Sequence, residues 1–311
     1  MTLDLSGILA CVHCGELLPP ESSWDTTGTR CAGCGTEVPV VRGIPRFVGS
    51  DAYSSSFSFE WNRHRLTQLD TAYNNESERT FRQKTGLGPE DVKGKLVLDV
   101  GCGMGRFLDV VSRWGGRVMG VDLSLAVEAA YANLAGRANV RILQADLFHL
   151  PFRPGTFDIV YSIGVLHHTP DCEKAFRQLP KFLKPGGRVA IWVYGPMGPW
   201  VRFAGFYRRF TVRMPPRLLH ALCHVAIPLY YLYRIPGVGR LFWDLFPASV
   251  HPNAAWRVLD TFDWYSPRYQ SKHTYPEVYR WFQTEGLVEI ELLDFPVAIS
   301  GLKPPKTSSE S

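Results

Sequence analysis

The feature that most constrains the fold is a short apolar run, followed by a glycine-rich turn and then by a segment whose apolar residues recur at helical spacing. Residues 96–100 are LVLDV, which is the composition of a buried parallel strand. The turn has glycines at every second position (Gly101, Gly103 and Gly105), and apolar side chains then recur at helical spacing up to residue 114. A strand, a glycine turn and a helix form the first half of a nucleotide-binding βαβ unit, so we expect a doubly wound α/β domain.

Acidic residues end the next two predicted strands, 117–122 and 140–144. Asp122, with Leu123 beside it, lies where a carboxylate can accept hydrogen bonds from both hydroxyls of a ribose. Asp146 can accept from the amino group of an adenine while Leu147 packs on the ring. The sequence therefore predicts an adenosine-containing ligand.

The position of Asp99 distinguishes between two such ligands. A nicotinamide enzyme usually has G-x-G-x-x-G with a pyrophosphate over the turn. Here the pattern is Asp99-x-Gly101-x-Gly103-x-Gly105. An acid two residues before the first glycine suits a ligand that has an ammonium group and no pyrophosphate, and S-adenosylmethionine fits that description.

A fourth strand near 157–161 leads into a loop that begins at Ser162 and ends in a histidine pair, His167 and His168. Ligands and chemistry gather at the carboxyl ends of strands in open α/β sheets. The segment that starts at Leu183 is a turn into a fifth strand, and Pro180 should shorten the helix before it.

Residues 95–194 resemble class I S-adenosylmethionine-dependent methyltransferases, and most of all the small-molecule and quinone methyltransferases among them. The resemblance rests on four ordered motifs: VLDVGCGMGRFL, GVDLS, QADLFHLPFRPGTFDIVYSIGVLHH and LKPGGRVAIWVY. It implies a seven-stranded, mostly parallel, Rossmann-like sheet. The cofactor residues that it implies are Asp99, Gly101, Gly103, Gly105, Asp122, Leu123, Asp146, Leu147 and Ser162, with the three glycines along the methionine part.

Methyl transfer from a sulfonium needs a positioned nucleophile, and an oxygen or nitrogen of high pKa also needs a base. His167 and His168 are the first candidates for that base, because the pKa of a histidine lies near neutrality. Tyr161, Tyr194 and His273 are weaker candidates. The fourth strand ends in Ser-Ile-Gly-Val rather than in an Asn/Asp-Pro-Pro-Tyr/Phe motif, which argues against the usual amino-methylating nucleic-acid enzymes.

Four cysteines near the N-terminus form two C-x-x-C pairs, Cys11 with Cys14 and Cys31 with Cys34, separated by sixteen residues. Four thiolates can surround one structural zinc, which would supply the folding energy of so small a module. The alternatives are disulfides or free thiols, but the N-terminus has no secretion signal, so we expect a cytoplasmic protein. The segment up to Phe47 resembles zinc ribbons that occur in methyltransferases or act on them.

The class I fold should finish with a helix, opened by a capping box at Thr274-Tyr-Pro-Glu277, and two strands, 287–293 and 295–300. A helical insertion rich in aromatic residues separates the fifth strand from this last helix. Between residues 196 and 256 it has seven arginines and one acid, a charge of +6 in a chain of +5 overall. It could be a lid with its own core, an amphipathic cap that touches a membrane surface, or a surface for RNA. Its longest apolar run, 218–235, falls short of the ~20 residues that span a bilayer.

These patterns predict six segments: a zinc ribbon, a helical linker that covers the active site, the S-adenosylmethionine-binding core, the cap, the last helix and strands, and a flexible tail. Their ranges are 1–50, 51–94, 95–194, 195–272, 273–302 and 303–311.

Three functions compete. The first is a methyltransferase for a small-molecule, lipid or glycan-precursor acceptor, the second is a tRNA or rRNA methyltransferase, and the third is a non-catalytic interaction protein with the same fold. The ribbon has little positive charge with which to bind RNA, because Arg30 is its only basic residue between Cys11 and Cys34. The sequence leaves the acceptor atom and the oligomeric state open.

Overall fold

The computed structural model describes residues 3, 5–49, 54–71, 73–134, 136–196 and 201–305, without the side chains of residues 201 and 202. Trp200 of the aromatic insertion and residues 306–311 of the predicted tail therefore lie outside the described residues.

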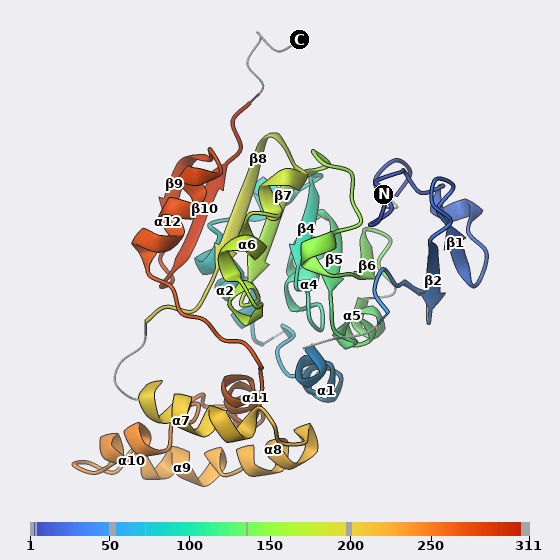
Figure 1. Cartoon of the computed structure of the whole chain (residues 1–311). Coiled ribbons are helices and arrows are strands. Elements are labelled where there is room, and N and C mark those ends of the chain that lie inside the picture. The colour runs from blue at the N-terminus through green and yellow to red at the C-terminus, as the bar shows by residue number, and fades with distance from the viewer. Residues whose placement is uncertain are drawn as a thin grey trace.

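A seven-stranded sheet forms the centre of the molecule (Figure 1). Its order is β6-β5-β4-β7-β8-β10-β9, and β10 alone runs in the direction opposite to the other six strands. The strands are β4 (Leu96–Val100), β5 (Arg117–Asp122), β6 (Val140–Gln144), β7 (Phe157–Ile163), β8 (Leu183–Trp192), β9 (Val288–Leu292) and β10 (Ala298–Leu302). This confirms the predicted Rossmann-like fold of class I methyltransferases.

Both faces of the sheet are covered, which is why its central strands are apolar at nearly every position. On one face Val97 packs against α2 (Glu76–Thr85), α4 (Arg106–Arg113) and α5 (Ala126–Leu134). On the other face Leu98 packs against α6 (Cys172–Phe176) and α12 (Tyr275–Thr284). The short helix α3 (Pro89–Val92) leads into β4. Two apolar cores, one on each face, hold the sheet.

Several local predictions are confirmed. The helix α12 begins with the predicted capping box, in which the Glu277 amide donates to Thr274 Oγ1 at 3.4 Å. Proline shortens the earlier helix as expected: α6 ends at Phe176, and a 3₁₀ turn with Pro180 near its start follows.

One boundary is wrong. The last strand begins at Ala298 rather than at Phe295, because the Ala298 amide donates back to the Phe295 carbonyl at 2.9 Å and closes a turn there.

The insertion forms a helical cap beneath the sheet in Figure 1. Its helices are α7 (Val201–Thr211), α8 (Pro216–Cys223), α9 (Ala226–Leu232), α10 (Gly239–Leu245) and α11 (Ala254–Tyr265). Figure 1 shows α11 and α1 (Ser55–Arg63) between the outer cap helices and the sheet. A small core around Leu219, Val258 and Phe262 holds the cap together. In the part of the chain that the structure describes, no helix is both long and apolar enough to cross a membrane.

The N-terminal module lies against the β6 edge of the sheet (Figure 1). It contains three short antiparallel strands, β1 (Gly28–Arg30), β2 (Glu37–Val41) and β3 (Ile44–Pro45). The chain continues beside β6, where Arg46 pairs in parallel with Gln144 and the Phe47 amide donates to the Gln144 carbonyl at 2.8 Å. The module therefore protects an edge that would otherwise expose unpaired backbone groups.

Arg46 anchors this contact and provides a test of it. Its side chain is 6% exposed and donates to Gln144 Oε1 at 2.9 Å and to Glu128 Oε1 at 3.1 Å. Arg46→Ala leaves Glu128 without its buried partner and should lower the free energy of unfolding by about 3 kcal/mol, measured by chemical denaturation. Arg42 binds the same Glu128 at 2.6 Å but is 74% exposed, so the matched variant Arg42→Ala should cost less than about 1 kcal/mol. Equal losses would contradict the anchoring role of Arg46.

Candidate active site

A cavity of about 540 Å³ opens at the carboxyl ends of the central strands. One half is formed by the segments that follow β4, β5, β6 and β7, and the other half by α1, α2, α11 and the end of β8. This size lies in the range of small-molecule sites. The cavity contains most of the residues that the sequence predicted for a cofactor.

The glycine turn after β4 can exist only without a side chain at Gly101. Its φ is +87°, and a Cβ there would lie 2.3 Å from Cγ2 of Val165, in the loop after β7. Gly101 and Gly103 line the cavity, and a Cβ on Gly103 would face the Trp61 ring at 3.5 Å. Gly105 does not line it. A Cβ on Gly105 would lie 2.8 Å from Leu134, so this glycine allows α5 to pack closely against the turn.

Asp122 lies at the end of β5 and faces the cavity. The Gly103 amide donates to its Oδ2 at 2.9 Å, and the Ser124 amide donates to its Oδ1 at 2.8 Å. Burial raises the pKa of Asp122, while the Ser124 and Gly103 donors act against that shift. Its carboxylate is thus oriented by the glycine turn itself. Leu123, Asp146 and Leu147 line the same side of the cavity.

Asp99 and Ser162 are behind the cavity and do not line it. Burial raises the pKa of Asp99 to about 8, and the nearby charge of Asp122 adds to this effect, so Asp99 is largely protonated at neutral pH. The Ser162 hydroxyl donates to the Val100 carbonyl at 2.8 Å and so ties β7 to β4. Both residues support the turn from within the sheet.

The two neighbouring histidines have different surroundings. His167 is fully buried, stacks on Tyr194 with ring centroids 3.8 Å apart, and does not line the cavity. The Tyr194 amide donates to its Nδ1 at 3.3 Å. Burial lowers the pKa of His167 well below its ordinary value, so the ring is neutral. Its position makes His167 a packing residue.

His168 lines the cavity. Its Nδ1 lies 2.9 Å from the Tyr269 carbonyl, an acceptor, so Nδ1 must be the donor and carry the proton. The other nitrogen, Nε2, then has a free lone pair, and it has no hydrogen-bond partner among the described residues. Burial lowers the pKa of His168, while the charge of Asp263 acts in the opposite direction. His168 is therefore neutral at pH 7 and able to accept a proton. Of the weaker candidates, Tyr194 also lines the cavity, whereas Tyr161 and His273 do not.

Sequence reasoning missed the ionisable residues in the far half of the cavity. They come from α1, α2, the start of α4, the segment before α11, and α11 itself: Glu60, Glu76, Lys84, Arg106, His251, Asp260 and Asp263. The Tyr194 hydroxyl donates to Asp263 at 2.8 Å, so part of this group is linked to the end of β8. The residues had no motif in common, and each of them resembles an ordinary exposed ionisable residue.

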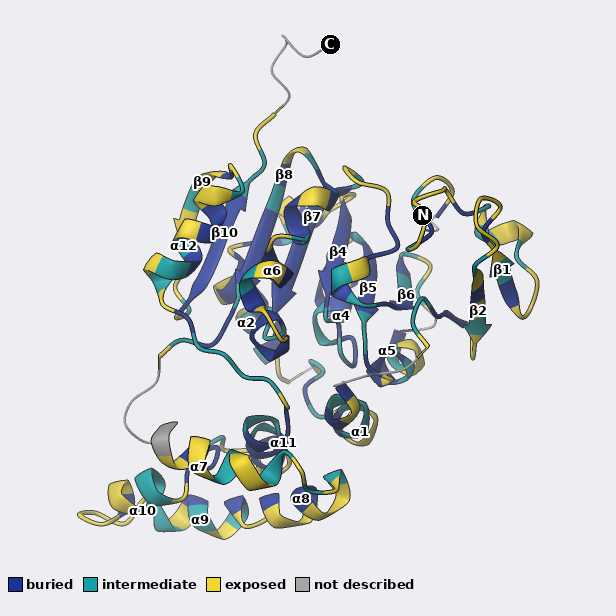
Figure 2. Ribbon diagram, in the orientation of Figure 1, coloured by how far each residue is buried: buried dark blue, intermediate teal, exposed yellow. Residues whose placement is uncertain are grey.

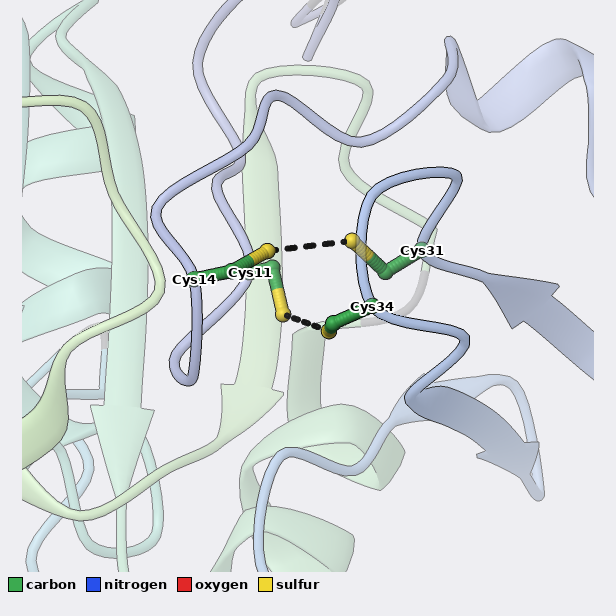
Figure 3. Close-up of side chains that lie close together, drawn as sticks. All are labelled: Cys11, Cys14, Cys31 and Cys34. Carbon is green, nitrogen blue, oxygen red and sulfur yellow. Dashed lines mark hydrogen bonds between the residues drawn. The ribbon is translucent and has the colours of Figure 1, made fainter.

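The four cysteines of the N-terminal module meet at one point (Figure 3). The sulfurs of Cys11 and Cys34 are 3.5 Å apart, as are those of Cys14 and Cys31, and all four lie within 4.8 Å of one another. A disulfide would need about 2.05 Å. Four sulfurs at about 2.3 Å from a central ion lie about 3.8 Å apart, so this cluster could hold a metal ion.

Comparison with known proteins identifies the central part of the chain. Residues 98–191 match a family described as a methyltransferase domain. The chain is 34% identical over 134 residues to demethylmenaquinone methyltransferase of Thermobifida fusca, covering 42% of this chain and 57% of that protein. It is 30% identical over 173 residues to phosphoethanolamine N-methyltransferase 1 of Arabidopsis thaliana, covering 54% of this chain and 34% of that protein.

The chain therefore spans less than two thirds of the length of either relative. A solved structure of an S-adenosylmethionine-dependent methyltransferase from Mesorhizobium loti is 20% identical, with a TM-score of 0.44 over 73% of this chain and 98% of that one. Together, the sheet order and the matched segment identify residues 98–191 as a methyltransferase domain with the class I, Rossmann-like fold.

Proposed function

We propose that this chain is an S-adenosylmethionine-dependent methyltransferase that acts on a small-molecule, lipid or glycan-precursor acceptor. The observation that carries the proposal is a single cavity that joins the glycine turn, Asp122 and Asp146 to a second, aromatic half. In this proposal the ribbon (1–50), the linker (51–94) and the cap (195–272) surround the core (95–194 and 273–302).

The cofactor half fits S-adenosylmethionine in its chemistry. Gly101 and Gly103 would adjoin the methionine part, because neither has a side chain to fill that space. The Asp122 carboxylate would accept from the ribose hydroxyls, and Asp146 with Leu147 would hold the adenine. Asp99, Gly105 and Ser162 would act on the cofactor indirectly, through the shape of the turn.

The bound cofactor would supply an electrophilic methyl group on a sulfonium. The protein then has to hold the acceptor in line, exclude water and remove a proton where the acceptor atom has one. His168 Nε2 is the candidate for that last step, because it has no hydrogen-bond partner among the described residues and the side chain lines the cavity. His167 would keep its neighbours Tyr194 and His168 in place rather than touch the acceptor.

Asp122→Ala tests the cofactor assignment. The loss of charge-assisted hydrogen bonds, each worth about 1.5–3 kcal/mol, should weaken the binding of S-adenosylhomocysteine by at least about tenfold in calorimetry. Asp244→Ala, on the outer cap helix α10, is the control and should leave the affinity unchanged. An unchanged affinity in Asp122→Ala would remove the ribose role. If the wild-type protein binds neither S-adenosylmethionine nor S-adenosylhomocysteine, the non-catalytic alternative is favoured.

For the four-cysteine cluster we propose a structural zinc ion. The purified protein should contain about one zinc per chain by elemental analysis, and Cys31→Ser should lose it, because the ligand set would be incomplete. Chelation should also lower the melting temperature, since the module packs on β6. Cys223→Ser, in the cap, is the matched control and should keep the zinc. A metal-free wild-type protein of unchanged stability would contradict this assignment.

We also propose that the outer face of the cap touches a membrane surface rich in anionic lipid. Figure 2 shows exposed residues along α7 to α10. Large apolar side chains there are half exposed, including Phe206 at 52%, Phe210 at 57% and Leu241 at 58%. Exposed arginines lie among them: Arg209, Arg213, Arg217, Arg234 and Arg240. Apolar residues interleaved with cations suit the interface of an anionic bilayer.

Vesicle co-sedimentation tests this surface. The protein should bind phosphatidylglycerol vesicles better than phosphatidylcholine vesicles, and added salt should weaken binding. The double variant Phe206→Ser and Phe210→Ser should bind at least about tenfold more weakly, because two aromatic side chains no longer enter the interface. Leu66→Ser is the control, because Leu66 is 61% exposed but lies outside the cap. Salt-sensitive binding to RNA without binding to vesicles would instead favour the RNA methyltransferase.

A further inference from the structure

The far half of the cavity contains a buried carboxylate that has no partner. Glu60, in α1, is 0% exposed and lines the cavity. Neither of its oxygens has a hydrogen-bond partner among the described residues. An isolated ionised carboxylate is costly to bury, and proteins normally pair such a group. A buried polar group that lines a cavity and has no partner in the protein indicates a ligand that supplies the missing donor.

The cations nearby do not fill this role. Lys84 Nζ lies 3.2 Å from the centroid of the Trp192 ring and 4.5 Å from that of Phe295, so two aromatic faces already hold it. Arg106 Nε donates to Ser77 Oγ at 3.0 Å. In the described part of the chain, neither cation is a hydrogen-bond partner of Glu60. The Glu60 carboxyl group thus has no partner, whereas both cations have one.

Two more acids from α11 border the same space. Asp263 accepts from Tyr194, and Asp260 accepts from the Ser249 hydroxyl at 3.1 Å. Burial raises the pKa of Asp260 to about 7 and the pKa of Glu60 well above its ordinary value, with Asp263 adding to the shift of both. Glu60 and Asp260 therefore resist ionisation, and a bound cation would relieve that cost.

The remaining wall is aromatic. Trp61, Trp256 and Trp264 line the cavity along with Tyr194. Aromatic faces attract a cation that has left water, whereas they offer little to an anion. A cavity lined by an unpaired carboxyl group and by several aromatic rings is therefore complementary to a compact organic cation.

We propose that the acceptor is a small molecule with an aliphatic amine that is protonated in solution, and that the Glu60 carboxylate binds this ammonium group. For the amine nitrogen to accept the methyl group it would first lose one proton, for which His168 Nε2 is the available base. The freed lone pair of the nitrogen would then form the new N–C bond as the S–C bond of the sulfonium breaks and the neutral thioether leaves. The inference rests on the proposed methyltransferase function, because it assigns the substrate class of the same site. A total volume of about 540 Å³, shared with a cofactor, leaves room for a small molecule or for the head group of a larger one.

Three probes of similar shape and different charge test the inference: 2-phenylethylamine, 2-phenylethanol and phenylacetate. Each is titrated into the protein saturated with S-adenosylhomocysteine, and the fluorescence of the tryptophans that line the cavity reports binding. We expect the amine to bind at least about tenfold more tightly than the alcohol or the acid, because only the amine forms a charge-assisted hydrogen bond with Glu60.

The variant Glu60→Gln keeps the shape of the side chain and removes its charge. It should abolish the preference for the amine and leave S-adenosylhomocysteine binding intact, which also shows that the variant is folded. Glu289→Gln, on the exposed edge strand β9, is the matched control and should keep the preference.

The outcomes separate the two proposals. If S-adenosylhomocysteine does not bind the wild-type protein, the proposed function fails. If it binds, but the amine has no advantage or Glu60→Gln keeps the advantage, the function stands and the assignment of an amine acceptor is overturned. Tighter binding of phenylacetate would likewise overturn it and would point to Lys84 and Arg106.

Discussion

The close approach of Gly101 and Val165 holds together two of the loops that form the cofactor half of the site. Gly101 belongs to the turn after β4 and Val165 to the loop after β7, and these strands are neighbours in the sheet. The chain leaves β4 towards β5 and returns to β7 from the other side, so no crossover covers the crevice between their carboxyl ends. A side chain at Gly101 would push the two loops apart. The turn that orients Asp122, and the loop that ends in His168, depend on this close approach.

The second constraint is desolvation. Within this cavity burial raises the pKa of Glu60 and Asp122 and lowers the pKa of His168, so it favours the neutral forms of these three side chains. A neutral His168 can take a proton, and carboxyl groups that resist ionisation respond strongly to a bound cation. The cap contributes to both effects, because α11 supplies Asp260 and Asp263 and separates the cavity from solvent, while α7 to α10 leave apolar residues and arginines outside.

Much of what was predicted from the sequence rested on short stretches of consecutive residues. The strands of the core, the capping box at Thr274 and the clustered cysteines were predictable because each is encoded in a few consecutive residues. The sequence could not distinguish His167 from His168. Their burial and hydrogen-bond partners come from Tyr194 and Tyr269, which lie far along the chain. Gly105 and Ser162 were also expected to line the site. Instead, Gly105 faces α5 and the Ser162 hydroxyl donates to the Val100 carbonyl of β4, which again depends on residues distant in the sequence.

The sequence by itself determined the class of fold, the likeness of residues 95–194 to S-adenosylmethionine-binding domains and the number of thiolates available for a metal, because spacing and periodicity express these properties directly. Only the tertiary structure decided which charged side chains are buried away from water. Glu60, Lys84 and Asp263 are separated by up to 203 positions in the sequence and appear as ordinary charged residues on helices. Packing of the cap on the core buries them around one space, and burial converts solvated surface charges into groups that select a ligand.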